Sequence, residues 1–258
     1  MNIAIVTGAS SGIGREFALQ LDGRGGLDEI WIAARRRDRL ENLENAMKTK
    51  VRIIEEDLSK DDAYSSLETC LAESQARIKI LVNAAGAGKF GSVESQNLSD
   101  IISMTDVNIK ALTAVTKVCL PYMADGSGII NMASVSAYPV LPYLAVYSAS
   151  KAYVLHFSQA LAYEVKSRGI SVTAVCPYWV ESEFIPLAEN TPDGKCINNF
   201  AFITYPFPLV KKALCDNEMG KTASLCGLIP KAVRCLSKKL PVCCQAAVWN
   251  AVRLLRCC

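Results

Sequence analysis

The sequence predicts a doubly wound α/β fold, in which helices cover both faces of a parallel β-sheet. Two observations lead to this prediction. Short apolar runs of strand length alternate with helix-length segments as far as Val175, and a glycine-rich turn follows the first of these runs. Strands that alternate with helices pair in parallel through right-handed crossover connections, which places helices on both faces of the sheet.

The elements follow in order along the chain. Residues 2–6 are an apolar run that leads into the glycine turn and a helix from about residue 13; the run 29–33 precedes a polar helix at 38–48, and the run 51–55 precedes a helix at 61–75. The second half repeats the pattern, with strand 78–82 before a long helix at 100–123, strand 128–132 before a helix at 145–168, and a sixth strand at 170–175. Each run has the length and apolar character of a buried strand.

The alternation ends after Pro177. Residues 178–218 combine prolines with aromatic residues, which predicts a loop with short helices that forms a substrate-binding lobe. A short strand is expected at 222–225, followed by amphipathic helices at 230–239 and 241–256, each opening on a proline. The prediction is therefore a single domain over 1–258, with a basic helical extension at 219–258.

Charge excludes one class of partner and is unevenly distributed. The net charge of +3 is too small for a general nucleic-acid binder. From Met219 onward the chain has seven cationic residues and no acidic one, so the rest carries a net charge of −4. A basic segment of this kind is ordinarily a solvated helix face, and contact with a membrane surface or an anionic ligand is the alternative.

Compartment and metal chemistry are predicted from what the sequence lacks. The run Ile3 to Val6 is too short for a signal peptide and no run is long enough to span a membrane, which predicts a cytoplasmic protein. The 11 cysteines show no paired metal-binding spacing and are expected to be reduced thiols, with no metal bound. The single histidine, His156, lies within a predicted helix, which argues against a histidine-dependent triad.

The glycine turn predicts a dinucleotide site. It lies between a strand and a helix, where glycines let the backbone approach a phosphate and the helix N-terminus offers free N–H groups. This is the Rossmann form of the doubly wound fold. The residues expected to contact the cofactor here are Gly8, Ser10, Ser11, Gly12, Ile13 and Gly14.

The end of the second strand indicates NADP(H) as the cofactor. An acidic residue at this position would bind the ribose 2′-hydroxyl of NAD. The sequence has Arg35-Arg36-Arg37 instead, and guanidinium groups can hold a 2′-phosphate with forked hydrogen bonds. Arg35 and Arg36 are the predicted phosphate ligands, whereas Arg37 is expected to be solvated.

Tyr147 and Lys151 are the predicted centre of catalysis. Their i, i+4 spacing places both on one helix face. A free phenol has a pKa near 10, and a nearby ammonium, together with an oxidised nicotinamide ring, lowers it toward the range useful for proton transfer. Tyr147 can then protonate an alkoxide as hydride arrives, or remove the proton in the reverse direction.

These motifs, taken in order over residues 1 to about 182, resemble the classical short-chain dehydrogenase/reductase family. The resemblance implies a catalytic tetrad of Asn108, Ser134, Tyr147 and Lys151, in which Ser134 orients the substrate carbonyl and Asn108 serves a water-mediated proton relay. It also implies oxidoreduction between a nicotinamide and a carbonyl or hydroxyl carbon, and homodimers or homotetramers. The further cofactor positions that it implies are Asp57, Leu58, Asn83, Ala84, Gly86, Tyr147, Lys151, Pro177, Val180 and Ser182.

The sequence departs from this family pattern after the sixth strand. Tyr178 stands where the family has glycine, and Ser182 where it has a threonine that reaches the nicotinamide carboxamide. The run Pro-Tyr-aromatic-Val resembles a branch that includes 17β-hydroxysteroid dehydrogenases and long-chain 3-ketoacyl-CoA reductases. Of the neighbouring serines, Ser136 is expected to be structural or a secondary contact, and Ser148 and Ser150 to be polar residues on the helix face.

The expected substrate is a small lipophilic ketone or secondary alcohol, such as a steroid, held by Ser134, Tyr147, Tyr178, Trp179 and Phe184. Aromatic residues are frequent and charges few in the predicted lobe, although the same aromatics could instead pack its core. One alternative is a 3-ketoacyl-thioester reductase, for which the basic tail could bind a carrier phosphate. Another is a non-catalytic NADP-binding regulator, against which the complete tetrad argues.

Overall fold

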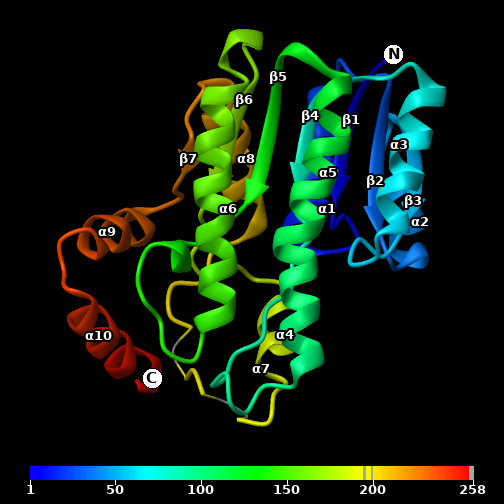
Figure 1. Ribbon diagram of the computed structural model, residues 1–258. Helices are drawn as coiled ribbons and strands as arrows, with labels where there is room; N and C mark the ends of the chain where they lie inside the picture. The colour runs from blue at the N-terminus through cyan, green and yellow to red at the C-terminus, as the bar shows by residue number, and fades with distance from the viewer. Residues whose placement is uncertain (194–195, 199, 256–258) are drawn as a thin grey trace.

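Among the residues that the structure describes, 1–193, 196–198 and 200–255, seven parallel strands form the central sheet of this computed structural model (Figure 1). The strand order β3-β2-β1-β4-β5-β6-β7 reverses direction between β1 and β4, where a doubly wound sheet binds its ligand. The predicted fold class is confirmed. The strands are β1 (Asn2–Thr7), β2 (Glu29–Ala34), β3 (Lys50–Glu55), β4 (Arg77–Asn83), β5 (Met123–Met132), β6 (Ser171–Val175) and β7 (Ala223–Ser224).

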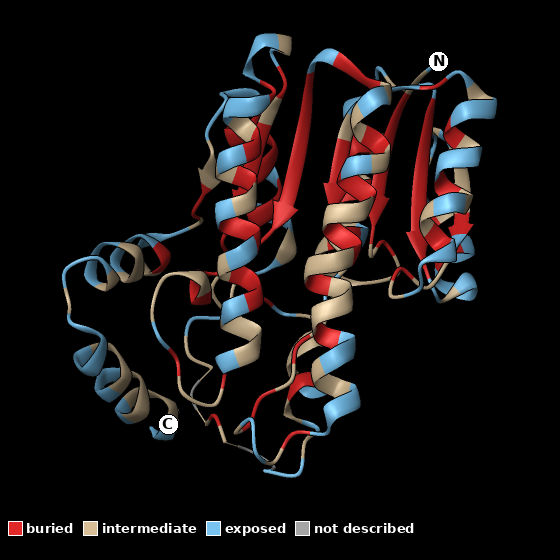
Figure 2. Cartoon of the chain, viewed as in Figure 1, coloured by how far each residue is buried: buried red, intermediate tan, exposed pale blue. Residues whose placement is uncertain are grey.

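Helices cover both faces of this sheet. Successive side chains of a strand point to opposite faces, so Ile3 and Ile5 belong to one core cluster and Ala4 and Val6 to the other. Figure 2 shows the central strands buried along their length. The first face is covered by α3 (Asp62–Ser74), α5 (Leu112–Cys119) and α6 (Ala145–Glu164), and the second by α1 (Gly12–Arg24), α2 (Arg37–Glu44) and α8 (Pro206–Glu218).

The long helix predicted at 100–123 is present as one continuous helical run, but it is not regular throughout. The chain forms α4 (Leu98–Thr105), a π-helical turn (Asp106–Ala111), α5 and a 3-10 turn (Leu120–Tyr122), and β5 then begins at Met123 rather than at residue 128. Pro121 explains the end of α5, because proline lacks the N–H that an α-helix needs in its interior. The π-helical turn has a consequence for the site, since it carries Asn108.

The prediction of a loop with short helices is wrong for residues 206–218. They form the regular helix α8, which buries Leu209, Val210, Ala213 and Leu214 against the sheet. This spacing of i, i+1, i+4 and i+5 is that of a helix with one apolar face. The aromatic residues and prolines nearby obscured it. The short helix α7 (Phe184–Glu189) lies earlier in the same range, so the predicted lobe divides into a segment near the site and a helix of the core.

The C-terminal extension forms the two helices predicted, with shorter ends. They are α9 (Leu228–Ser237) and α10 (Val242–Leu254), and Arg256 lies outside the described residues. In Figure 2 both helices are mostly exposed or half-buried. Hydrogen bonds fix α10 to the rest of the chain, from Trp249 Nε1 to the Pro142 carbonyl (2.8 Å) and from Arg253 Nη1 to the Cys196 carbonyl (2.9 Å). Within the described ranges, no helix is long and apolar enough to cross a membrane.

A buried row of polar side chains joins the carboxyl ends of the central strands. Thr7, Asn83 and Asn131 lie in register on β1, β4 and β5. Asn83 Nδ2 donates to Asn131 Oδ1 (2.9 Å) and to Thr116 Oγ1 on α5 (3.0 Å), and Asn131 Nδ2 donates to Ser158 Oγ on α6 (2.9 Å). Two strands and two helices are thereby tied together directly beneath the edge of the sheet at which ligands bind.

Replacing Asn131→Ala is expected to lower the free energy of unfolding by about 1–3 kcal/mol, because a buried amide donor of Asn83 loses its acceptor. Urea unfolding of the variant measures this loss. The matched control is Asn42→Ala on the exposed surface of α2, for which a change within about 0.5 kcal/mol is expected. Equal effects of the two substitutions would contradict a stabilising role for the network.

Candidate active site

The glycine turn is packed so tightly that neither Gly8 nor Gly14 has room for a side chain. Gly8 has φ +68°, and a Cβ there would lie 2.6 Å from the Ala85 nitrogen. A Cβ on Gly14 would lie 2.3 Å from the Gly8 carbonyl oxygen. The Thr7 hydroxyl fixes the facing segment by accepting hydrogen bonds from the Ala84 and Ala85 nitrogens (3.1 Å each). The N-terminus of α1, at Gly12, is held against the cleft as an anion-binding end requires.

A cavity of about 640 Å³ runs from this turn to the catalytic residues. This volume is in the usual range for a small-molecule site. The predicted residues that line it are Gly8, Ser10, Ser11, Gly12, Ile13, Gly14, Arg35, Arg36, Asp57, Leu58, Ala84, Gly86, Ser134, Tyr147, Lys151, Pro177, Tyr178, Trp179, Val180, Ser182 and Phe184. The structure thus brings together almost all of the residues that the sequence singled out.

Two predicted residues, Asn83 and Asn108, do not line this cavity, and the expected contact of Asn83 with the cofactor is corrected accordingly. Asn83 is buried in the polar row of the sheet, because its amide is used by Asn131 and Thr116. Asn108 is buried behind the cavity wall, where its amide accepts from the Ala87 nitrogen and donates to the Ala87 carbonyl (2.9 Å each). Both are positioning residues in this geometry.

Ser150 is a buried residue next to the site that the sequence prediction misjudged. It was expected on the helix surface, but it is only 1% exposed. Its hydroxyl accepts from Asn108 Nδ2 (3.0 Å) and donates to the Tyr147 carbonyl (2.7 Å). The signal was present, since Tyr147, Ser150, Lys151 and Val154 share one helix face by their spacing. Asn108 and Ser150 together fix the start of α6, where Tyr147 lies.

Tyr147, Ser134 and Lys151 meet at the inner end of the cavity. Ser134 follows β5 and its hydroxyl is hydrogen-bonded to that of Tyr147. Lys151 Nζ donates to the Met132 carbonyl (2.9 Å) and lies 5.7 Å from the centroid of the Tyr147 ring. These three side chains come from β5 and α6, the two elements that the Asn131–Ser158 hydrogen bond joins.

Burial dominates the electrostatics of this group. It raises the pKa of Tyr147 to about 12, which the hydrogen bond with Ser134 opposes, and it lowers the pKa of Lys151 to about 8. The sequence predicted the opposite direction for Tyr147, from the nearby ammonium. Desolvation prevails because it is the largest effect on the pKa of each group. Little water surrounds the phenol, so a positive charge beside it would interact strongly with the phenolate form.

Aromatic side chains form the wall opposite Tyr147. Phe184 lies 5.5 Å from the Tyr147 ring between centroids, and Trp179 lies 6.0 Å from Phe90 in an edge-on arrangement. Trp249 of α10 also lines the cavity, and the sequence prediction did not include it. No local pattern could have found it, because the contact depends on how α10 folds back onto the loop before α6. Ser136 lines the cavity too, and within the described residues its buried hydroxyl has no hydrogen-bond partner.

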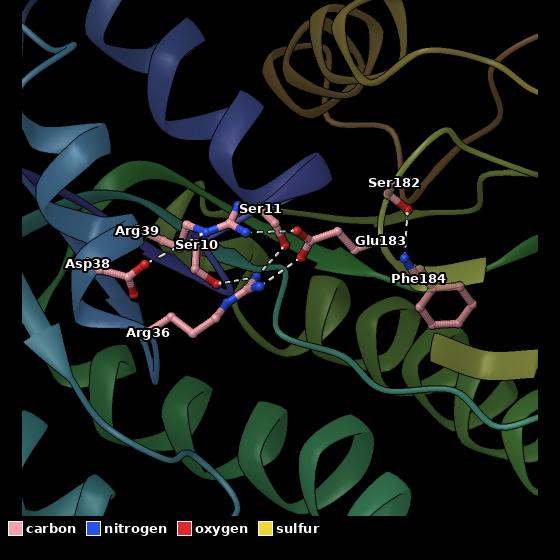
Figure 3. A network of polar contacts seen from close by, with 8 residues as sticks. All are labelled: Ser10, Ser11, Arg36, Asp38, Arg39, Ser182, Glu183 and Phe184. Atoms are coloured by element: carbon pink, nitrogen blue, oxygen red, sulfur yellow. Dashed lines mark hydrogen bonds and ion pairs between the residues drawn. The ribbon is translucent and has the colours of Figure 1, made fainter. Parts of the chain in front are cut away.

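The basic residues after β2 lie at the other end of the cavity (Figure 3). Arg36 donates from Nη2 to the hydroxyls of Ser10 (3.1 Å) and Ser11 (3.0 Å). Arg35 is exposed near Asp57. Burial raises the pKa of Asp57, but hydrogen bonds from Ser59 and the charge of Arg35 outweigh this effect, so the pKa lies below its usual value. Arg37 pairs on the surface with Glu41 (2.8 Å) and Glu55 (3.2 Å).

The glycine turn and the group of Tyr147, Ser134 and Lys151 thus line one cavity. The family model described as short chain dehydrogenase matches residues 2–191. The chain belongs to the short-chain dehydrogenase family. This confirms the family that the motifs predicted.

Individual relatives cover this chain to different extents. The very-long-chain 3-oxoacyl-CoA reductase of Rattus norvegicus is 35% identical over 207 residues, or 76% of this chain, which spans only 65% of that protein. A short-chain dehydrogenase from Sphingobium yanoikuyae, solved in complex with NADPH, has a TM-score of 0.75 at 27% identity, covering 93% of this chain and 97% of the other. The bulky-bulky ketone specific alcohol dehydrogenase from Comamonas testosteroni has a TM-score of 0.72 at 26% identity, covering 93% and 95%.

Replacing Lys151→Met is expected to stabilise the protein without cofactor by about 2 kcal/mol at pH 7. The lowered pKa means that folding opposes protonation of Lys151, a cost of about 3 kcal/mol, and the lost hydrogen bond offsets about 1 kcal/mol of the gain. The cost is fully present below pH 8 and disappears as the pH rises toward 10.5, where the unfolded chain also loses the proton.

Urea unfolding at pH 7 and near pH 10 tests this expectation. Lys211→Met, on the exposed surface of α8, is the control and should change stability little at either pH. A stabilisation by Lys151→Met that is the same at both pH values would show that burial of the charge is not its cause.

Proposed function

We propose that the protein is an NADP(H)-dependent oxidoreductase that acts on a lipophilic ketone or the corresponding secondary alcohol, with Tyr147 as general acid and base. The observation that carries this proposal is the convergence of Tyr147, Ser134 and Lys151 at the inner end of the cavity that begins at the glycine turn. The cofactor supplies or accepts the hydride when bound. The residues described below account for binding, orientation and proton transfer.

The cleft has the features that a dinucleotide phosphate requires. The N-terminus of α1 supplies N–H groups for the pyrophosphate, and Gly86 leaves room beside Asn108 and Lys151, where even an added Cβ would meet nothing closer than 3.4 Å. Arg36, Ser10 and Ser11 form a cationic, hydroxyl-lined corner after β2, as a 2′-phosphate needs. These features support NADP(H) rather than NAD(H), and the NADPH complex of the Sphingobium yanoikuyae relative is consistent with them.

Tyr147 and its neighbours have separate tasks in the proposed reaction. The Ser134 hydroxyl donates a hydrogen bond to the substrate carbonyl oxygen and so orients it near Tyr147. The Tyr147 hydroxyl gives its proton to that oxygen as negative charge develops there, or takes the proton back during alcohol oxidation. Lys151, when protonated, stabilises the phenolate that remains. Asn108 and Ser150 hold the Tyr147 backbone in place, and the aromatic wall limits the access of water.

Replacing Tyr147→Phe is expected to reduce NADPH-dependent turnover by at least about 100-fold, because the general acid is lost. The dissociation constant for NADPH should stay within about threefold, since the ring and its packing remain. Tyr163→Phe, an exposed tyrosine of the same helix, is the matched control and should leave both quantities unchanged. Undiminished turnover by the Tyr147 variant would refute the mechanism, whereas NADPH binding without turnover in the unaltered protein would favour the regulator.

Lipophilic substrates are favoured by the residues around Tyr147. Leu141, Leu144, Trp179, Phe184 and Trp249 line the cavity next to it, and few charges lie among them. A steroid-like ketone fits this wall by its chemistry, and the relative from Comamonas testosteroni is described as specific for bulky ketones. A 3-oxoacyl thioester is the second candidate, which the 35% identity with the rat reductase favours. Lys89 at the cavity lining could attract its phosphate.

A substrate panel separates these candidates. NADPH oxidation would be followed at neutral pH with bulky ketones including steroids, with 3-oxoacyl-CoA thioesters and with small aldehydes, and NADH would be tested in parallel. Replacing Trp249→Ala should lower kcat/KM about tenfold for the preferred long or bulky substrate and change it little for small aldehydes, because Trp249 belongs to the apolar wall that a large substrate would contact. Leu254→Ala on the exposed side of α10 is the control. A uniform loss over all substrates would argue against a role of Trp249 in selectivity.

We also propose a cytoplasmic homodimer or homotetramer that pairs through α5 and α6. The exposed aromatic residue Tyr163 (75% exposed) on α6 supports this surface as an interface. Nucleic acid is not an expected partner. Contact between the basic extension and a membrane stays a prediction. The division of the chain into a substrate-binding lobe at 178–218 and a basic extension at 219–258 also stays a prediction.

A further inference from the structure

The carboxylate of Glu183 lies in the basic corner of the cleft (Figure 3). Glu183 directly follows Ser182, in the loop between β6 and α7. Its Oε2 lies 2.8 Å from Arg36 Nη1, and its Oε1 lies 3.3 Å from Arg39 Nη2. The same Arg36 guanidinium donates to Ser10 and Ser11 through its other terminal nitrogen. An anion supplied by the chain itself is thus bound where three separate elements meet.

Two carboxylates lie in this corner, since Asp38 Oδ2 is 3.9 Å from Arg39 Nε, but among the described residues only Glu183 forms an ion pair with Arg36. Arg36 and Arg39 come from the end of β2 and from α2, and the two serine hydroxyls come from the turn before α1. Guanidinium groups bind carboxylates and phosphates with the same forked geometry. A phosphate monoester carries nearly two negative charges and three acceptor oxygens, so it matches these donors better than a carboxylate does.

Glu183 is well placed to exchange with such a ligand. Its side chain and that of Arg36 are each about two-fifths exposed, so the ion pair can open without disturbing the core. The Ser182 Cβ lies close to Gly12, because a Cβ added to Gly12 would come within 3.2 Å of it. The loop that carries Glu183 therefore crosses the cleft from the β6 side to the glycine turn.

We propose that Glu183 is a specificity-determining residue that occupies the 2′-phosphate subsite and competes with the cofactor for Arg36. This inference rests on the proposed use of NADP(H). Binding of NADPH requires its 2′-phosphate to displace the carboxylate, whereas NADH has a hydroxyl at this position and gains nothing from the displacement. Glu183 consequently weakens NADPH binding selectively, and it opposes the preference that Arg36 creates.

The size of the effect follows from the nature of the ion pairs. Each exposed ion pair contributes little free energy. Glu183 forms two such pairs, with Arg36 and Arg39. Replacing Glu183→Gln is expected to lower the dissociation constant of NADPH about three- to tenfold at low ionic strength and to change that of NADH less than about twofold. Added salt should reduce the difference between variant and unaltered protein, because it screens the competing carboxylate.

Three variants test the proposal by fluorescence titration with NADPH and NADH. Glu181→Gln removes the same charge from an exposed position two residues earlier in the loop, and it controls for a general change in electrostatic potential. Tighter NADPH binding by the Glu183 variant alone supports the proposal. Weaker NADPH binding would overturn it and indicate that Glu183 closes over the bound cofactor, and equal tightening for both cofactors or by both glutamate variants would also overturn it.

Arg36→Gln separates this proposal from the proposed function. If Arg36→Gln lowers the preference for NADPH and Glu183→Gln does not raise it, the phosphate subsite stands and the role of Glu183 is refuted. If Arg36→Gln leaves the preference for NADPH unchanged, the assignment of the phosphate subsite is itself wrong, and the role of Glu183 fails with it.

Discussion

The buried hydrogen bond between Asn83 and Asn131 is the interaction on which the rest of the site depends. It joins the carboxyl ends of β4 and β5, and its continuation to Ser158 joins β5 to α6. The segments that follow these strands carry Gly86 and Ser134, and α6 carries Tyr147 and Lys151. The relative position of cofactor cleft and proton donor is therefore set by amide groups that touch neither. Hydrogen bonds in a buried environment of low dielectric are electrostatically stronger than in water.

Catalytic use of this arrangement has a cost in stability. Burial keeps the Tyr147 phenol protonated and opposes protonation of Lys151, so the site holds a proton donor in an environment that disfavours the charged form of both groups. A charged ligand placed there interacts strongly because little water screens it. The same reasoning applies at the other end of the cleft, where Arg36 is bound to Glu183 rather than left without a counter-charge.

The sequence predicted the sheet, the glycine turn and the Tyr147–Lys151 pair because each has a local pattern of its own. It did not predict contacts that join distant segments: Asn83 with Asn131, Asn108 with Ser150, and Trp249 with the cavity. Asn108 was expected to serve a water-mediated proton relay, and its amide is used by the Ala87 backbone and by Ser150. Helix α8 was missed because proline and aromatic residues resemble a loop composition, while its apolar face is defined only by the sheet it covers.

Transfer of deuterium from NADPH labelled at both C4 positions tests the central claim most directly. The protein would be incubated with this cofactor and the preferred carbonyl substrate, and the product would be examined by mass spectrometry and NMR. The account predicts an alcohol with one deuterium on the former carbonyl carbon, and with its hydroxyl proton drawn from solvent through Tyr147. Tight NADPH binding with no labelled alcohol from any ketone or 3-oxoacyl thioester would contradict it.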